Sequence, residues 1–461
     1  MKNNIPVEKN KEYILEITGT GFKGEGVAKV ENYTIFVPEA LEGEKVKVRI
    51  VKVNKNFGFG KLIDFEVKSK DRVEPICSIY NKCGGCQLQH YSYHKQLDFK
   101  RQRVVDAIKR IGKIDIKDEG IKDTIGMEDP YRYRNKVQMP VREEGGKIKI
   151  GFYKSRSHDV VEVKECFIQE KVADKAIYVI KEWMEKYNIS AYNEKKNKGL
   201  LKHIMVRKAF KNNDETMIVL VTNSKTIPYK DELIESIREN IPTITSIIHN
   251  INTKNTNVIL GQKCVTLWGK DYITDYIGKF KFNISPLSFF QVNPTQTEVL
   301  YNKALEFADL KGNELVFDAY CGTGTISLFL SENCREVYGV EIIKEAIDNA
   351  KINAKQNNIH NAKFIVGKSE EEIPKLIDQG KLPDVIVVDP PRKGCDEKLL
   401  KSISKTNASK IVYVSCDPGT LARDLGLLDN LGYKTEKVQP VDMFPMTSHV
   451  ETIVLLTKEN Q

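Results

Sequence analysis

The sequence lacks the features of a membrane-bound or exported protein. It has no long apolar run, and its mean hydropathy is −0.40, so we expect no membrane-spanning helix. The first residues, from Met1 to Pro6, lead into no apolar stretch, so we expect no secretory signal and a cytoplasmic location. There is no internal repeat and no low-complexity segment. Its 461 residues predict two to four domains.

The sequence also lacks a large excess of positive or negative charge. Lys and Arg number 72 against 63 Asp and Glu, a formal net charge of +9. This mild excess permits a polyanionic partner without requiring one. The nine cysteines are an odd number in a chain for which we expect no export, so a disulfide framework is excluded and free thiols are expected.

Four of the cysteines form a candidate metal site. Cys77, Cys83 and Cys86 are arranged as C-x5-C-G-G-C, and Cys166 follows 80 residues later. Two adjacent glycines let the backbone wrap closely around a metal centre. Four thiolates suit zinc or an iron–sulfur cluster, and the spacing does not choose between them. Ordinary buried thiols are the alternative.

The chain divides into three regions of different pattern. Residues 11–65 alternate in short segments punctuated by glycine, which predicts a small β-barrel, a fold that often binds nucleic acid; a structural module without a ligand is the alternative. Residues 91–285 mix helix, as at 171–186, with strands such as 148–153 and 216–222. From about 290 onward, strand, turn and helix repeat. We therefore predict an α/β fold: a barrel in 1–68, a central α+β domain in 69–285, and a Rossmann-like, doubly wound sheet in 286–461.

A nucleoside site is predicted in the last region. The apolar strand 315–320 runs into a turn containing Gly322 and Gly324, then into a helix, and the next strand ends at Glu341, 19 residues beyond Gly322. A dinucleotide fingerprint requires a third glycine where Ser327 stands, and no GK[ST] follows, so a P-loop is excluded. S-adenosylmethionine, a nucleoside without a pyrophosphate, fits better. A purely structural turn is the alternative.

Chemically useful side chains follow the next strands. Asp389 ends one strand in a rigid proline turn, and Cys416 ends another beside the start of a helix, where we expect the thiolate to be favoured. Glu451 begins the last strand, and His449 lies two residues before it. If that strand is antiparallel to its neighbours, its start lies at the same edge as Cys416, and either residue could accept a proton.

A thiol, a base and S-adenosylmethionine together indicate methylation at an unactivated carbon. Nitrogen and oxygen acceptors have lone pairs and need no covalent help. Addition of a thiolate to C6 of a pyrimidine makes C5 enolate-like, so that C5 can attack the sulfonium methyl group. A base must then remove the C5 proton before the cysteine can leave.

The chain resembles the RNA uracil-5-methyltransferases, which make 5-methyluridine in ribosomal and transfer RNA. The matching motifs are Ser288–Asn293, Asp318–Gly324, Asp389–Arg392, Ser415–Pro418 and His449–Glu451. The resemblance implies that Gln291, Tyr320, Glu341 and Asp389 contact S-adenosylmethionine. It also implies that Cys416 is the nucleophile and Glu451 the base. Thr325 stands where many relatives carry asparagine, so a cofactor contact is in doubt there.

The resemblance extends to the cysteines and the barrel. Ribosomal-RNA members carry the same cysteine pattern, which implies a [4Fe-4S] cluster on Cys77, Cys83, Cys86 and Cys166. The barrel is similar to a TRAM domain, an RNA-binding module of the oligonucleotide-binding type. The transfer-RNA members commonly lack both features, so the resemblance favours 23S ribosomal RNA as the substrate.

One more segment predicts RNA contact. Tyr131–Lys136 alternates aromatic and basic side chains, which can stack on bases and neutralise phosphates; an exposed strand with solvated charges would look the same. We expect RNA as partner, neither DNA nor membrane, and a monomer. Methylation of transfer RNA, an amino-group methyltransferase and a non-catalytic RNA-binding iron–sulfur protein remain as alternatives.

Overall fold

The N-terminal sheet of the computed structural model closes on itself. The model describes residues 5–155, 157–211, 214–406 and 408–459. The sheet order is β1-β5-β6-β4-β3-β2, with bounds β1 Glu12–Glu16, β2 Gly19–Thr20, β3 Gly26–Val30, β4 Tyr33–Val37, β5 Lys45–Val53 and β6 Phe57–Val67. β1 pairs with β5 at one edge, whereas Thr18, two residues after β1, donates its backbone N–H to Val27 of β3 at the other edge. The chain thus joins both edges of the sheet, and apolar side chains such as Ile35 and Val48 fill its interior.

The central region is a seven-stranded sheet with two helices packed on it. Its order is β13-β12-β11-β10-β7-β8-β9, with bounds β7 Lys136–Glu144, β8 Lys147–Tyr153, β9 Val160–Glu162, β10 Leu201–Lys208, β11 Thr216–Thr222, β12 Ile244–Ile251 and β13 Lys263–Gly269. The helices α2 (Lys171–Lys186) and α3 (Lys230–Asn240) pack on it around Trp183 and Leu233. The expected helix and both expected strands of this region are present.

The C-terminal sheet has the order β18-β17-β16-β19-β20-β22-β21. Its strands are β16 Leu315–Ala319, β17 Glu336–Glu341, β18 Ala362–Val366, β19 Val385–Val388, β20 Lys410–Ser415, β21 Tyr433–Val441 and β22 Glu451–Lys458. β16 to β20 are parallel, and β22 inserts antiparallel between β20 and β21. The prediction of a Rossmann-like sheet is confirmed, and the last strand meets the condition of running antiparallel to its neighbours.

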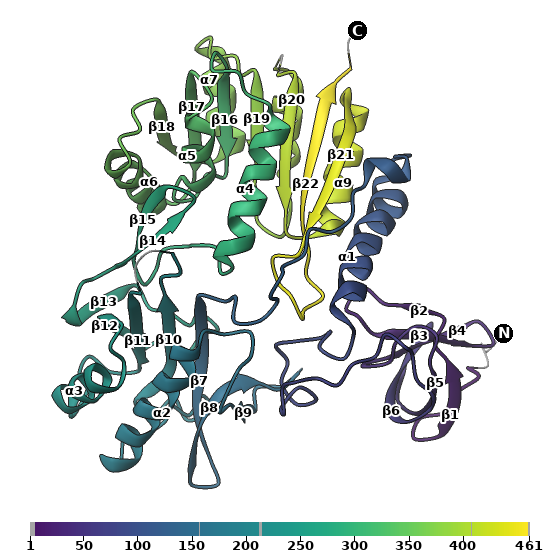
Figure 1. Cartoon of the computed structure of the whole chain (residues 1–461), viewed down its shortest axis with the longest axis vertical. Coiled ribbons are helices and arrows are strands. Elements are labelled where there is room, and N and C mark those ends of the chain that lie inside the picture. Colours follow the sequence, from purple (N-terminus) through teal and green to yellow (C-terminus); the bar gives the residue numbers. More distant parts are fainter. Residues whose placement is uncertain (1–4, 156, 212–213, 407, 460–461) are drawn as a thin grey trace.

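Helices cover both faces of this sheet, as Figure 1 shows. Their bounds are α1 Tyr93–Ala107, α4 Pro294–Ala308, α5 Thr325–Ser331, α6 Lys344–Gln356, α7 Ser369–Asp378, α8 Glu397–Ser404 and α9 Pro418–Asn430. α4, α5 and α6 contribute to one core cluster, and α7, α8 and α9 to the other. α1 continues as a π-helical turn, Ile108–Gly112, and joins the second cluster, so a segment far away in the sequence completes this domain. A short 3-10 turn follows at Asp118–Gly120.

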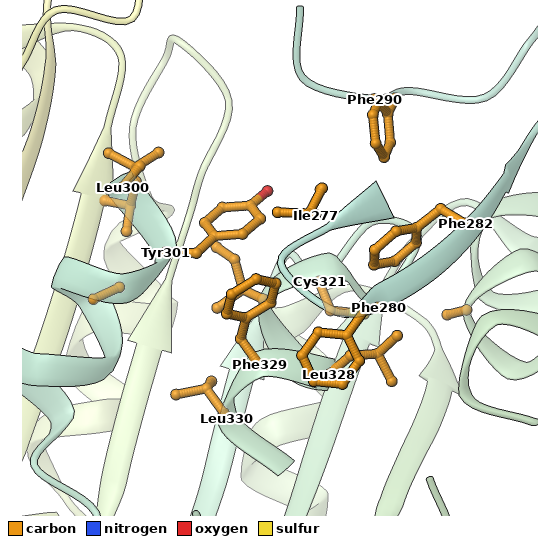
Figure 2. Close-up of a cluster of buried hydrophobic side chains, with 14 of the residues drawn as sticks. Ile277, Phe280, Phe282, Phe290, Leu300, Tyr301, Cys321, Leu328, Phe329 and Leu330 are labelled. Atoms are coloured by element: carbon orange, nitrogen blue, oxygen red, sulfur yellow. The ribbon is translucent and has the colours of Figure 1, made fainter. Parts of the chain in front are cut away.

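A hairpin of β14 (Ile273–Ile277) and β15 (Phe280–Ile284) packs onto the first core cluster. Figure 2 shows Phe280 beside Phe329 of α5, with ring centroids 5.0 Å apart, and Tyr301 of α4 on the other side of Phe329. Edge contacts between buried aromatic rings add to the hydrophobic stabilisation. The hairpin therefore anchors the segment that leads into α4. No helix among the described residues is long and apolar enough to cross a membrane.

Candidate active site

The turn after β16 has an unusual backbone. Tyr320, Gly322 and Gly324 have φ of 67°, 55° and 79°, in the left-handed region. A Cβ on Gly324 would lie 2.9 Å from the ring of Phe364, so this position excludes a side chain as well as requiring glycine's freedom. Tyr320 lacks the conformational freedom of glycine, so its left-handed backbone is strained. Strained residues of this kind cluster at ligand sites. The turn lies at the carboxyl edge of the sheet, where open α/β folds bind ligands.

Ser327 has a clear role at the position where a dinucleotide site would have its third glycine. Its hydroxyl donates to Oδ2 of Asp318, which is fully buried in β16. Oδ1 of Asp318 has no hydrogen-bond partner among the described residues. Burial raises the pKa of Asp318 to about 7, with the Ser327 hydrogen bond opposing the shift and the charge of Asp389 contributing to it. The turn therefore leaves one carboxylate oxygen available to a ligand or a solvent molecule.

The four residues expected to contact the cofactor lie on separate elements. Tyr320 follows β16, Glu341 ends β17 and Asp389 follows β19. These three parallel strands are neighbours in the sheet, so the fold brings the three residues to one edge. Glu341 accepts a hydrogen bond from the Ile343 backbone N–H at 2.9 Å. Gln291 comes from the segment before α4, where Asn135 Nδ2 donates to its backbone carbonyl at 3.0 Å. Their roles as cofactor ligands stay predictions.

Cys416 and Glu451 meet across neighbouring strands. Ser415 of β20 pairs with Thr452 of β22, so the next residue outward on each strand is Cys416 and Glu451 respectively. Glu451 is buried, whereas Cys416 is half-buried. The antiparallel insertion of β22 thus places both side chains at the carboxyl edge, beside Asp389.

The electrostatics around Cys416 differ from the expectation. Burial, together with the charges of Glu451 and Asp389, raises the pKa of its thiol to about 12. The start of α9 does not offset them, because the Asp417 carboxylate already accepts hydrogen bonds from the backbone N–H groups of Gly419 (2.9 Å) and Thr420 (3.0 Å). The prediction of a favoured thiolate is therefore wrong for the protein without its substrates.

Two carboxyl groups beside the thiol are also shifted. Burial, followed by the charge of Asp389, raises the pKa of Glu451 to about 8, and Arg392 opposes the shift. Burial raises the pKa of Asp389 to about 7. Groups with pKa values near neutrality can gain and lose protons during turnover. This edge of the sheet therefore combines a thiol with a carboxyl group poised to exchange protons.

The segment before Glu451 is held from several sides. The ammonium of Lys100 on α1 forms a fully buried ion pair with Asp442, and donates to the Phe444 carbonyl at 3.0 Å. Tyr93 donates from its hydroxyl to Asp442 Oδ2 at 2.9 Å. Asn293, which also caps α4, donates to the Met443 carbonyl at 3.0 Å. These supporting contacts could not be predicted from the sequence, because no local motif marks contacts between positions hundreds of residues apart.

The four predicted cysteine ligands gather at one cavity. Cys77, Cys83, Cys86 and Cys166 line a cavity of about 410 Å³. The loop that carries the first three is fixed by the Gly84 N–H, which donates to the Tyr153 carbonyl at 3.1 Å, and Cys83 accepts from the Gly85 N–H. Burial raises the thiol pKa of Cys86 to about 12 and that of Cys166 to about 11.

The four cysteines line the same cavity but are not arranged as a preformed metal site. Among the described residues, no group of three or more His, Cys, Asp or Glu side chains is arranged to hold a metal ion. Four half-buried thiols that line one cavity nonetheless have the right donor chemistry for a polynuclear iron–sulfur centre. Metal binding by these four cysteines stays a prediction.

The fold and the carboxyl-edge site define a Rossmann-like methyltransferase with additional N-terminal domains. A family model described as tRNA (Uracil-5-)-methyltransferase matches residues 92–459, and a TRAM domain model matches residues 6–63. The chain belongs to the tRNA (uracil-5-)-methyltransferase family. The resemblance found in the sequence motifs and the TRAM prediction are confirmed.

Relatives match over nearly the whole length. A protein of Clostridium tetani described as an uncharacterized RNA methyltransferase is 61% identical, covering 99% of this chain and 98% of the relative. A Halalkalibacterium halodurans protein with the same description is 50% identical, covering all of both chains. The crystal structure of Pyrococcus abyssi tRNA (uracil-54, C5)-methyltransferase in complex with S-adenosyl-L-homocysteine is 29% identical. It aligns with a TM-score of 0.79 over 96% of this chain and 99% of that chain.

Proposed function

We propose that this enzyme uses S-adenosylmethionine to methylate C5 of a uridine in 23S ribosomal RNA. The observation that carries the chemistry is the register of β20 and β22, which sets Cys416 beside Glu451 at the sheet's carboxyl edge. An amino-group methyltransferase would need neither the thiol nor the base. The RNA methyltransferase descriptions of the full-length relatives support the substrate class.

In this proposal the two residues act in sequence. Cys416, which is half-buried, gives up its proton to solvent as its sulfur bonds to C6 of uracil, and the electrons of the C5–C6 double bond move onto the C4 carbonyl oxygen. These electrons return through C5, which takes the electrophilic methyl group that S-adenosylmethionine would supply, and S-adenosylhomocysteine would leave with the electron pair of the broken S–CH3 bond. The Glu451 carboxylate then removes the C5 proton, the C5–C6 double bond reforms, and the thiolate of Cys416 leaves. The neighbouring pKa values of Glu451 and Asp389 keep a proton acceptor available near pH 7 to 8.

We propose that Gln291, Tyr320, Glu341 and Asp389 hold S-adenosylmethionine. Glu341 ends the strand next to the glycine turn, where a carboxylate can accept hydrogen bonds from ribose hydroxyls. The product complex of the Pyrococcus abyssi relative supports a cofactor of this class. The Tyr301 hydroxyl bonds to Thr325 Oγ1 at 3.0 Å, so Thr325 already has a partner within the protein. We therefore assign no cofactor contact to Thr325.

We further propose that Cys77, Cys83, Cys86 and Cys166 bind a [4Fe-4S] cluster, whose irons would stabilise thiolates that burial alone disfavours. Anaerobically purified protein should then absorb at roughly 400 nm, as thiolate-bound clusters do. Stoichiometric zinc without iron would contradict the assignment.

Transfer RNA is the second candidate substrate. The description of the matching family and the Pyrococcus abyssi enzyme favour it. The barrel does not separate the two, because that tRNA enzyme aligns with 96% of this chain. The four gathered cysteines support ribosomal RNA, in keeping with the resemblance. Three further properties are also predictions: the enzyme is monomeric, it is cytoplasmic, and it acts on RNA and not on DNA.

Mass mapping of RNA from a deletion strain tests the choice. The proposal predicts that one 23S rRNA fragment from the deletion strain is lighter by about 14 mass units, because a hydrogen stands in place of a methyl group. Transfer RNA should be unchanged. Loss of the methyl group from transfer RNA alone would contradict the ribosomal assignment.

A further inference from the structure

The cavity beside the cysteines extends to the active-site edge. Besides the thiols, its lining includes Arg392, three residues after Asp389, and His449, two residues before Glu451. In Figure 1 the loop between β21 and β22 reaches down toward the central sheet, which brings this segment near β7. A group bound in the cavity would therefore lie next to the substrate at Cys416. Its volume of about 410 Å³ falls in the range of small-ligand sites.

Cationic side chains form one wall of the cavity. Burial alternates from residue 133 to residue 138, so Arg134, Lys136 and Gln138 share the more open face of an extended segment that leads into β7. All three line the cavity. Neither Arg134 nor Lys136 forms an ion pair with a described residue. Burial, then the charges of Arg207 and Arg134, lowers the pKa of Lys136 to about 8. Glu165, an acid that also lines the cavity, is paired with Arg132, so it does not neutralise Arg134 and Lys136, and these two cations favour an anionic ligand.

An aromatic ring, that of Phe444, lines the same cavity as the cysteines. The Arg134 guanidinium lies 6.0 Å from the centroid of Phe444, and the His449 ring meets Phe444 edge-on with centroids 6.1 Å apart. Arg134 and His449 thus bracket a half-buried ring that lines the space. Nucleic-acid bases stack on aromatic rings and guanidinium planes in this kind of setting.

Two buried amides in the lining lack partners. Gln169 and Gln89 are 5% and 6% exposed, and the Oε1 atom of each has no hydrogen-bond partner among the described residues. Both side chains line the cavity. A buried acceptor without a partner costs free energy unless a ligand or water supplies a donor. Gln169 is next to the cation wall, since the Arg134 backbone pairs with it in a short parallel bridge.

We infer that this cavity binds a second nucleotide of the RNA substrate, adjacent to the methylated uridine. Arg134 and Lys136 take its phosphate, Phe444 stacks on its base, and Gln169 Oε1 accepts a hydrogen bond from an N–H on the edge of that base. The inference rests on the proposed function, because it takes RNA as the substrate. It adds the site at which a flanking nucleotide binds and the side chains that recognise it. The cysteine end of the cavity stays available for the proposed cluster.

The test compares variants of the full-length enzyme on two unmodified transcripts, 23S rRNA and a tRNA. Lys136→Gln should weaken RNA binding about tenfold and reduce the salt dependence of log Kd by about one phosphate contact. Lys136→Arg should retain binding. Lys147→Gln is the matched control, because Lys147 is an exposed lysine on the neighbouring strand β8 and does not line the cavity.

Gln169→Leu tests base reading independently. Loss of one buried acceptor should lower kcat/KM for RNA about tenfold and leave KM for S-adenosylmethionine unchanged. The inference is contradicted if Lys136→Gln binds RNA as Lys147→Gln does, or if folded Gln169→Leu turns over RNA normally. If the wild type binds RNA but methylates neither transcript, the proposed function fails instead, and the binding comparison still tests the subsite.

Discussion

Lys100 and Asp442, 342 positions apart in the sequence, form an ion pair in which both side chains are fully buried. Asp442 lies nine residues before Glu451, and its other carboxylate oxygen accepts a hydrogen bond from Tyr93. The pair fixes α1 to the segment that precedes Glu451. A buried charge is stable only while its partner remains.

Asp442→Asn should therefore be strongly destabilising. It leaves the Lys100 ammonium buried without a counter-charge, and we expect the free energy of unfolding to fall by about 3–5 kcal/mol in chemical denaturation. Lys95→Gln is the control, because it removes a solvent-exposed pair with Asp98 and should cost less than about 1 kcal/mol. Equal effects of the two substitutions would show that the buried pair does not support the segment.

Activity should increase with pH through the titration of Glu451. Its pKa is raised to about 8, and only the carboxylate form can accept the C5 proton. With RNA and S-adenosylmethionine below saturation, kcat/KM should rise with pH below about pH 8 and approach a tenfold rise per pH unit well below that value. A profile that is flat from pH 6 to 8 would exclude a base with this pKa.

The same shift has a consequence for stability. The folded state raises the pKa of Glu451 from an ordinary value of 4.5 to about 8, so it binds the proton more tightly than the unfolded state does. The stabilising contribution of Glu451 is complete below about pH 4.5 and is lost as pH rises through 8. Glu451→Gln should thus become increasingly more stable than the wild type between these pH values in thermal unfolding. A difference independent of pH would contradict the assigned titration.

Gly324 should be the least replaceable glycine of the cofactor turn. Gly324→Ala adds both a strained φ of 79° and a contact of 2.9 Å with Phe364. We expect a loss of stability above the roughly 1–2 kcal/mol that a left-handed alanine costs, and a raised KM for S-adenosylmethionine. Gly380→Ala is matched, because Gly380 has the same φ of 79° but open space around it. A normal KM in folded Gly324→Ala would separate the turn from cofactor binding.

Local patterns were sufficient to predict much of this fold. The strand–turn–helix repeats after residue 290 predict β16, β17, β19, β20 and β22, and the antiparallel last strand predicts where Cys416 and Glu451 meet. The glycine-rich segment 19–26 shows no apolar alternation, although it contains β2 and begins β3. Glycines within short, tightly closed strands give no alternating signal, which explains that difference.

Long-range contacts could not be predicted in the same way. The favoured thiolate at Cys416 follows from its position beside a helix start, yet the capping carboxylate of Asp417 and the buried acids around it reverse the expectation. Likewise, Tyr131–Lys136 indicates RNA binding by its composition, but only packing shows that Arg134 and Lys136 share a cavity with Phe444. Burial and electrostatics depend on neighbours that are distant in sequence.

The proposed mechanism also predicts different roles for its two central residues. Cys416→Ala should abolish both turnover and covalent bonding to RNA. Glu451→Gln should lower turnover by about 10²–10⁴-fold, because the base is lost, while retaining the nucleophile. A covalent enzyme–RNA adduct should then accumulate in Glu451→Gln and be visible as a slow band in denaturing gels. If Glu451→Gln instead turned over normally, His449 would become the candidate base.

The most direct measurement is trapping with RNA that contains 5-fluorouracil, in the presence of S-adenosylmethionine. With fluorine in place of hydrogen at C5, there is no C5 proton for the base to remove, so the reaction stops at the covalent enzyme–RNA adduct. Peptide mass mapping should find the RNA attached to Cys416 in the wild type and no adduct in Cys416→Ala. The absence of an adduct in the wild type, or an adduct that persists in Cys416→Ala, would contradict the assignment of Cys416 as the nucleophile.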